Sequence, residues 1–272
     1  MCIRDSKLTT SFVSRLRAQD QTAWFELWET FGPVLRIQLQ KWGKGRIGPQ
    51  TVQDLSQETL AALSDCIDRY DPRKGARFST WLLAIAKHVL GDEMDRRHAQ
   101  KRGGNKRPAE LDESWMLQAK GASADAEYEA AIFRAKVEAA IRLTERSSDF
   151  TDFAVFRMRI LDGKPGKDVA DALGMSEPTV SRRLAKVRET LRSRLGEVLA
   201  TYSFTDDETG EAGRNGLVLG PNKADGPATP TPPIDAAFDE AVAEIYHRSQ
   251  SLRREEMGTL GGPGSASPSS RF

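Results

Sequence analysis

The sequence predicts an all-α protein made of two small helical domains, a flexible linker between them and a largely disordered C-terminal tail. Three observations predict this fold class. Apolar residues recur at three- and four-residue spacing in residues 8–107 and again in residues 130–200, which is the period of amphipathic helices. Residues 108–129 lack sustained periodicity, and much of residues 201–272 is rich in Gly, Pro, Ser and Thr. The second periodic region also contains the spacing of a helix-turn-helix.

Charge is distributed unevenly along the 272 residues, a length that allows more than one domain. Residues 1–110 hold 19 Lys and Arg against 13 Asp and Glu, and residues 134–195 hold 14 against 9. Residues 204–244 are acidic instead, with 2 basic and 9 acidic side chains. Two basic domains followed by an acidic tail fit a protein that binds a polyanion better than a neutral enzyme.

Cysteine content and hydropathy exclude several classes of protein. Cys2 and Cys66 provide neither a disulfide framework nor the spacing of metal ligands, and we expect Cys66 to be a small buried hydrophobe. No run reaches the ~18 apolar residues of a membrane span, and a signal-peptide core is absent. We therefore expect a cytoplasmic protein without metal, cofactor or membrane insertion. Met1–Ser6 resembles a translated sequencing-library end, so residues 1–7 are expected to be non-native or disordered.

The first domain is expected to begin with helices over residues 8–39. Asp20 is the expected helix cap, and Gly32–Pro33 is expected to break the pattern. Aromatic residues gather here at helical spacing, which indicates core packing rather than a platform on which bases stack. They are Trp24, Phe25, Trp28 and Phe31. The glycines of residues 43–49 do not follow a strand, so a phosphate-binding loop is not expected.

Residues 52–97 predict two helices joined by a Pro/Gly-bearing turn at residues 71–75. The apolar positions of the first helix are Val52, Leu55, Leu60, Leu63, Cys66, Ile67 and Tyr70. Those of the second are Phe78, Trp81, Leu82, Ile85, Val89 and Met94. The outer face of the second helix carries the bases Lys87, His88, Arg96 and Arg97. The basic run continues to Arg107, either as a solvated surface or as a phosphate contact.

The helix-turn-helix is predicted from residues 167–184. Ala170 is small where two helices must approach, and Gly174 supplies the turn four residues later. Ser176 is the expected cap of the second helix, and Pro178 is tolerated in its first turn.

The second of these helices separates into two faces. Val180, Leu184, Val187 and Leu191 form one apolar stripe that should pack inward. The candidates for DNA contact are Pro178, Thr179, Ser181, Arg182, Arg183 and Lys186. Arg182 is the expected reader of a base edge, because a guanidinium can bond a guanine bidentately. Lys186, Arg183 and Arg188 are the expected phosphate contacts.

The tail changes character at about residue 201. Its composition predicts disorder over residues 205–233, whereas residues 234–253 predict one helix that docks on the body or binds a partner. We also consider the hypothesis that the acidic stretch competes with DNA for the basic surfaces.

Two motifs together carry a family resemblance. Asp54-Leu-Ser-Gln57-Glu58, followed by Phe78-Ser-Thr-Trp81-Leu82-Leu-Ala-Ile85-Ala86 and then the helix-turn-helix, resembles bacterial sigma factors of the small, extracytoplasmic-function type. The resemblance covers about residues 8–200 and implies regions two and four of that family, at residues 8–107 and 130–200.

The resemblance also implies roles for particular residues. Asp54, Leu55, Gln57 and Glu58 would contact core RNA polymerase. Lys87, His88, Arg96 and Arg97 would contact the minus-ten promoter element, although His88 stands where the family usually has Asn. The helix-turn-helix would read the minus-thirty-five element. The implied protein is not an enzyme, since the polymerase makes the bonds, and its partners are core polymerase, promoter DNA and an anti-sigma factor or other regulator.

Two other classes stay open at this point. A plain helix-turn-helix regulator would bind DNA without needing the polymerase-binding motif. A recombinase or transposase would need a nucleophilic residue with arginines, or an acidic metal triad on a sheet, and no β-rich catalytic core is visible in the sequence.

Overall fold

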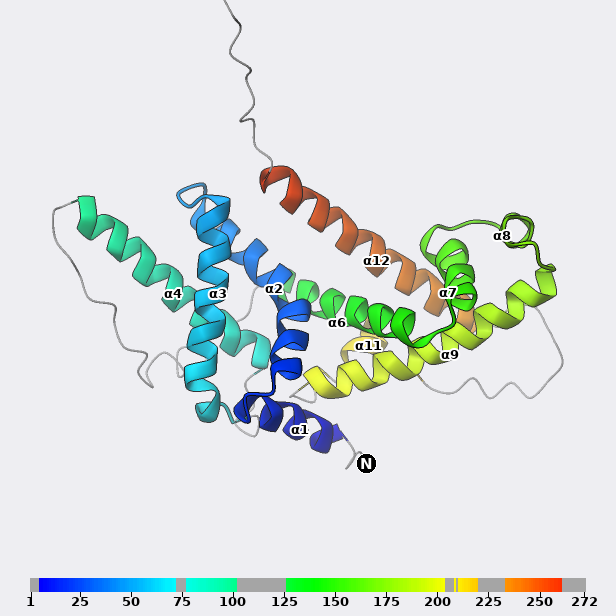
Figure 1. Cartoon of the computed structure of the whole chain (residues 1–272), viewed down its shortest axis with the longest axis horizontal. Coiled ribbons are helices and arrows are strands. Elements are labelled where there is room, and N and C mark those ends of the chain that lie inside the picture. The colour runs from blue at the N-terminus through cyan, green and yellow to red at the C-terminus, as the bar shows by residue number, and fades with distance from the viewer. Residues whose placement is uncertain are drawn as a thin grey trace, which may run out of the picture.

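The computed structural model describes residues 5–71, 77–101, 126–203, 208, 210–219 and 233–260, and these residues form helices and turns without a strand. The all-α fold class is thereby confirmed. Along the chain the elements are α1 (Asp5–Arg17), α2 (Gln21–Gly43), α3 (Pro49–Cys66), the 3-10 turn η1 (Ile67–Arg69), α4 (Phe78–Lys101), α6 (Ala126–Ser147), α7 (Phe150–Phe156), the π-helical turn η3 (Arg157–Leu161), α8 (Gly166–Leu173), α9 (Glu177–Tyr202), α11 (Glu211–Arg214) and α12 (Pro233–Leu260). Figure 1 shows an elongated molecule with α4 and α8 at opposite ends.

α1 begins at Asp5, within residues 1–7, a segment expected from the sequence to be non-native or disordered, whereas α2 begins directly after the predicted cap. Asp20 caps α2, because its Oδ1 accepts hydrogen bonds from the backbone N–H groups of Thr22 and Ala23 at 2.9 and 3.3 Å. The predicted break at Gly32–Pro33 is wrong, since α2 continues through Pro33 to Gly43. The loss of one backbone hydrogen bond at a proline is offset here by burial on both sides of it, at Phe31 and Val34.

α3 and α4 bury the apolar residues that the sequence predicts. Leu55, Leu63 and Cys66 of α3 are at most 3% exposed, and burial raises the pKa of the Cys66 thiol to about 11. Trp81 of α4 is also buried, and its ring stacks on Tyr70 with 4.9 Å between centroids. The aromatic cluster of α2 behaves as predicted only in part: Phe31 is buried, whereas Phe25 is 55% exposed.

The two halves of the chain share one hydrophobic core. α9 has 26 residues, which at 1.5 Å per residue is a rod of about 39 Å that runs from the helix-turn-helix back to α1. Near its end, the Tyr202 ring meets Phe12 and Phe31 edge-on, with centroids 5.0 and 5.3 Å apart. α2 also packs along α6. The residues expected to form the linker lie mostly outside the described part of the chain.

The tail contains more folded structure than its composition predicts. α11 lies within residues 205–233, and Ala212 and Leu217 near it are buried. The predicted helix at 234–253 is confirmed as α12, which is longer and packs against α6 and η3. Its side chains Phe238 and Val242 are fully buried, so α12 docks on the body of the protein.

Candidate nucleic-acid interface

The helix-turn-helix forms from α8 and α9 with the predicted turn. Gly174 adopts a left-handed conformation (φ 63°, ψ 37°), which glycine adopts without a steric penalty. Its N–H and that of Met175 bond back to carbonyls of α8, so the helix end is satisfied. Ala170 is 5% exposed beneath the crossing. Ser176 is the N-cap residue by its backbone, but its hydroxyl bonds the Thr179 hydroxyl at 2.9 Å instead of a backbone N–H.

α9 divides into the two predicted faces. Val180, Leu184, Val187 and Leu191 are at most 8% exposed and form part of the core. Pro178, Ser181, Arg182 and Lys186 are exposed, and Thr179 and Arg183 are partly exposed.

Arg182 is the basic residue at this end of α9 that is not held by an acid. Its Nε donates to the Pro178 carbonyl at 3.3 Å, and its guanidinium lies 3.5 Å from the Thr179 hydroxyl. Within the described residues it has no carboxylate partner. An exposed guanidinium in the first turns of a recognition helix is suited to bidentate contact with a base edge.

Arg183 and Lys186 are already paired inside the protein. Lys186 Nζ lies 2.7 Å from Asp152 Oδ2, and Arg183 donates to the other carboxylate oxygen of Asp152. The hydrogen bond from Lys186, followed by that from Arg183, lowers the pKa of the Asp152 carboxyl. Asp152 is 3% exposed on α7, and sequence reasoning did not identify it because the two helices meet only in the fold.

Arg188 faces α12 instead of solvent. It is 4% exposed and makes ion pairs with Asp235 and Asp239, and Arg192 one turn later also pairs with Asp235. Arg188 is an expected phosphate contact, but in this structure it is covered by the C-terminal helix.

The expected polymerase-binding residues separate into exposed and buried groups. Asp54, Gln57 and Glu58 are exposed on one side of α3, where Gln50 donates to Asp54 at 3.0 Å. Leu55 is 1% exposed in the core. Its inclusion in the contact set is therefore corrected, because a side chain on the inner face of α3 is not available to a partner.

The expected minus-ten residues of α4 are all engaged by neighbouring side chains. Lys87 Nζ lies 5.1 Å from the centre of the Trp42 ring, and His88 Nε2 lies 3.5 Å from Asp92 Oδ2.

Arg96 and Arg97 both bond the buried carboxylate of Glu93. Burial alone would raise the pKa of Glu93, but these hydrogen bonds outweigh it and lower the pKa. Arg97 also donates to the Arg46 carbonyl at 3.0 Å and to the Thr51 hydroxyl at 2.9 Å. Arg97 therefore ties the start of α3 to α4. The more exposed Arg96 lines a surface hollow with Arg46 and His98.

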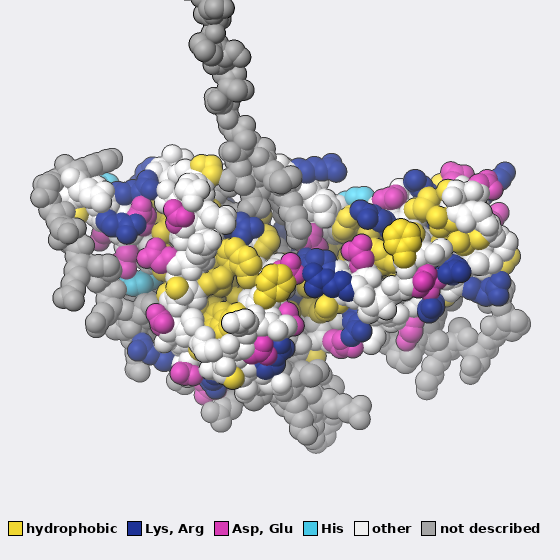
Figure 2. Space-filling view, in the orientation of Figure 1, with side chains coloured by type: hydrophobic (Ala, Val, Ile, Leu, Met, Phe, Trp, Pro, Cys, Tyr) yellow, Lys and Arg dark blue, Asp and Glu magenta, His cyan; other side chains and the backbone are white. Residues whose placement is uncertain are grey.

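Among the described residues on the face shown in Figure 2, the basic side chains do not form one continuous patch. On the face shown in Figure 2, Lys and Arg side chains alternate with Asp and Glu at both ends of the molecule. Most of the basic run that follows Arg97 lies beyond the residues that the structure describes. In the described part of the chain, no three His, Cys, Asp or Glu side chains converge as metal ligands would, and no helix has the length and hydropathy of a membrane span.

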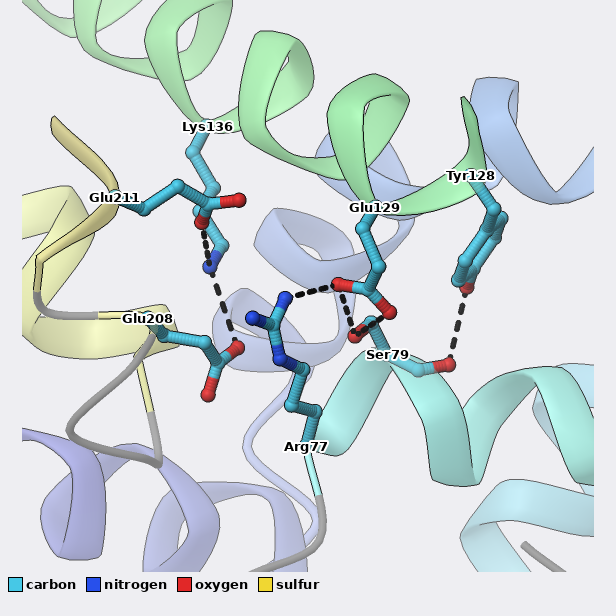
Figure 3. Close-up of polar contacts among 7 residues, drawn as sticks. All are labelled: Arg77, Ser79, Tyr128, Glu129, Lys136, Glu208 and Glu211. Atoms are coloured by element: carbon cyan, nitrogen blue, oxygen red, sulfur yellow. Dashed lines mark hydrogen bonds and ion pairs between the residues drawn. The ribbon is translucent and has the colours of Figure 1, made fainter. Parts of the chain in front are cut away.

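A polar network at the joint between the two halves was not predicted from the sequence (Figure 3). Arg77, just before α4, bonds Glu129 of α6 at 2.6 Å, and Ser79 donates to the same carboxylate at 3.1 Å. The Tyr128 hydroxyl donates to the Ser79 carbonyl at 3.1 Å. These contacts fix the start of α4 against the start of α6.

The tail reaches the same joint through Lys136 of α6. Lys136 is 1% exposed, and its Nζ lies 3.5 Å from Glu208 and 3.9 Å from Glu211. Burial raises the pKa of Glu211, while the nearby Lys136 charge lowers it by less. No local pattern in the sequence indicates this cluster, because Lys136 precedes Glu208 by 72 positions in the chain.

Two family models match the chain. Sigma-70 region 2 matches residues 34–100, and Sigma-70, region 4 matches residues 151–191. Among curated proteins, a probable RNA polymerase sigma-C factor of Mycobacterium bovis is 30% identical over 141 residues, covering 52% of this chain and 68% of the relative. The ECF RNA polymerase sigma factor SigC of Mycobacterium tuberculosis matches with the same identity and coverage.

Proposed function

Because the chain belongs to the sigma-70 family of RNA polymerase sigma factors, in its ECF group, we propose that it binds core RNA polymerase and directs it to promoters with two elements. α3 would carry the polymerase contact, α4 the minus-ten contact and α9 the minus-thirty-five contact. Because its proposed partners are core RNA polymerase and promoter DNA, the protein would act in the cytoplasm. The observation that carries the proposal is the joint presence of both family regions with an exposed Arg182, which has no carboxylate partner among the described residues, at the start of the recognition helix.

The geometry supports a division of labour between the two halves. The α9 end offers a narrow helix face for a duplex major groove, with Arg182 for base edges. Lys186 is exposed and Arg183 is partly exposed, so each could donate to a phosphate while it still bonds the buried Asp152, because ammonium and guanidinium groups carry several N–H donors. On α4, the proposed contacts to a separated strand are Lys87, His88 and Arg96. Lys87 and Arg96 are exposed and His88 is partly exposed, although each also contacts a neighbouring side chain.

Polymerase binding is tested by replacing Asp54, Gln57 and Glu58 with alanine together. These residues are exposed on α3, so the fold should be retained while affinity for purified bacterial core polymerase falls at least tenfold. Fluorescence anisotropy of the labelled protein measures the affinity. The matched control, Glu240→Ala with Glu244→Ala, removes the same charge from the exposed side of α12 and should bind as the wild type does.

Equal binding by the triple variant and the wild type would contradict the proposed α3 surface. Tight binding to duplex DNA with no affinity for core polymerase would favour the alternative, an ordinary helix-turn-helix regulator.

Base readout is tested by Arg182→Ala. We expect the loss of one bidentate contact to weaken binding to the preferred duplex by about 1–3 kcal/mol, or about 5- to 150-fold, and to relax the preference at one base pair. Selection from a randomised duplex library measures the preference. The comparison variant Lys186→Ala should weaken binding to all sequences alike, since phosphate contacts carry no sequence information. If Arg182→Ala weakens binding to all duplex sequences alike, Arg182 contacts a phosphate and not a base edge.

A further inference from the structure

Two arginines of α9 are held by α12 in the geometry that guanidinium groups use for phosphates. Arg188 bonds Asp239 through two nitrogens, at 2.9 and 2.6 Å, and reaches Asp235 with its third at 3.1 Å. Arg192 reaches the other oxygen of Asp235 at 2.5 Å. The Asp235 carboxylate thus bridges two guanidinium groups. Bidentate and bridging contacts of this kind are shared by carboxylate and phosphate ligands.

Asp235 and Asp239 of α12 do not accept a hydrogen bond from every N–H group of Arg188 and Arg192. Arg188 has all three nitrogens bonded, but Arg192 Nε is buried without a hydrogen-bond acceptor among the described residues. Its guanidinium instead lies 4.6 Å from the centre of the Phe238 ring. A buried donor without an acceptor lowers the stability of the fold. Arg192 can therefore still donate a hydrogen bond that the two carboxylates do not accept.

The position of the pair on α9 suits the backbone of a duplex. Arg188 follows Arg182 by six residues, which places it about 120° around the helix and about 9 Å along it. A helix in a major groove directs its front at base edges and has phosphates along its flanks. If Arg182 points at the bases, Arg188 and Arg192 lie on a flank.

The ion pairs that hold α12 can be replaced by phosphate contacts at a small cost in free energy. Buried ion pairs contribute little net stability, because the desolvation of both charges offsets their attraction. The apolar anchors that hold α12 are Phe238 and Val242, both fully buried, whereas Ile245 and Tyr246 are only partly covered. A polyanion that supplies phosphates to the arginines would replace the acidic contacts of α12. It would still have to offset the apolar contacts and the buried hydrogen bond from Ser249 to Glu138 of α6.

We propose that Arg188 and Arg192 form a second phosphate-binding site on α9, which α12 masks in cis through Asp235 and Asp239. The ligand is a phosphodiester backbone. The proposal rests on the DNA-binding role of α9 proposed above. With α12 in place the four charges cancel; with α12 displaced, α9 gains two positive charges on its flank. The C-terminal helix thereby lowers the affinity of the protein for DNA of any sequence.

The test is the salt dependence of binding to a mixed-sequence 30-base-pair duplex, with the full chain. Asp235→Asn with Asp239→Asn should tighten binding about tenfold near 100 mM salt. The slope of log affinity against log salt should steepen by about 1–2, since each phosphate contact contributes about 0.9. The control Glu240→Gln with Glu244→Gln removes the same charge from the exposed side of α12 and should change affinity less than twofold.

A charge-free combination provides the decisive comparison. Adding Arg188→Gln and Arg192→Gln to the two asparagine replacements should abolish the gain and return the slope to that of the wild type. Circular dichroism would check that each variant is folded. Phe238→Ala loosens α12 without altering any charge, so it should change affinity in the same direction even if the asparagine variant folds poorly.

The possible outcomes separate the two proposals. A gain that persists in the charge-free combination, or a gain no larger than that of the exposed-side control, overturns the masked site. If the wild type binds the duplex and Arg182→Ala alters its sequence preference, the DNA-binding role of α9 stands even when the masked site fails. If the wild type does not bind duplex DNA in a salt-dependent way, the DNA-binding role itself fails.

Discussion

Replacing Lys136 by methionine is expected to lower the free energy of unfolding by about 3–5 kcal/mol, the usual cost of removing one partner from a buried ion pair. The ammonium of Lys136 is 1% exposed and is the counter-charge for Glu208 and Glu211 of the tail. Without it, two buried carboxyl groups keep their desolvation cost and lose a favourable charge. Denaturant unfolding at neutral pH measures the loss.

A charge-neutral combination checks the cause. Adding Glu208→Gln and Glu211→Gln to Lys136→Met should recover at least half of the loss, because a neutral set has no unpaired buried charge. The loss in Lys136→Met should also shrink as the pH falls. A buried acid with a raised pKa binds its proton more tightly in the folded state, so its destabilising effect appears as pH rises through that pKa. A loss that is independent of pH and of the glutamine replacements would indicate altered packing instead.

Phe238→Ala is expected to lower the free energy of unfolding by about 3–5 kcal/mol, because it empties a fully buried site between α12 and α9. If α12 detaches as a unit before the rest of the protein unfolds, the loss will appear as early hydrogen exchange confined to residues 233–260. Either result, a lower free energy of unfolding or early exchange confined to α12, indicates a docked helix and not a free tail. Hydrogen exchange read by mass spectrometry resolves them.

Phe150→Ala is the matched control. Phe150 is 86% exposed at the start of α7, so the same change in side chain should shift stability by no more than about 0.5 kcal/mol. Equal, small effects of the two replacements would contradict the docking of α12.

Helical periodicity predicted most of the fold because it depends on local spacing. The stripe of Val180, Leu184, Val187 and Leu191 is buried as expected, and the cap at Asp20 and the left-handed turn at Gly174 lie where the sequence predicts them. Those features are determined within a few residues of the chain. The helix through Pro33 was missed, because tertiary burial outweighs the local preference of proline.

The partners of charged residues could not be predicted, because they depend on packing between distant elements. Arg183 and Lys186 read as solvent-facing bases, yet both bond Asp152 from another helix. Arg188 is covered by a tail helix 47 or more residues away. The period of α3 already placed Leu55 on its apolar stripe, so its burial was evident from the sequence, and only the family resemblance assigned it to a partner.

The measurement that tests the central claim most directly is run-off transcription with purified bacterial core polymerase on a promoter library. The wild type is predicted to produce transcripts from a defined set of promoters with two elements. These transcripts should be lost with the Asp54, Gln57 and Glu58 alanine variant and should shift in promoter preference with Arg182→Ala. Transcription no different from that of core polymerase alone, with the protein folded and bound to DNA, would contradict its role as a sigma factor.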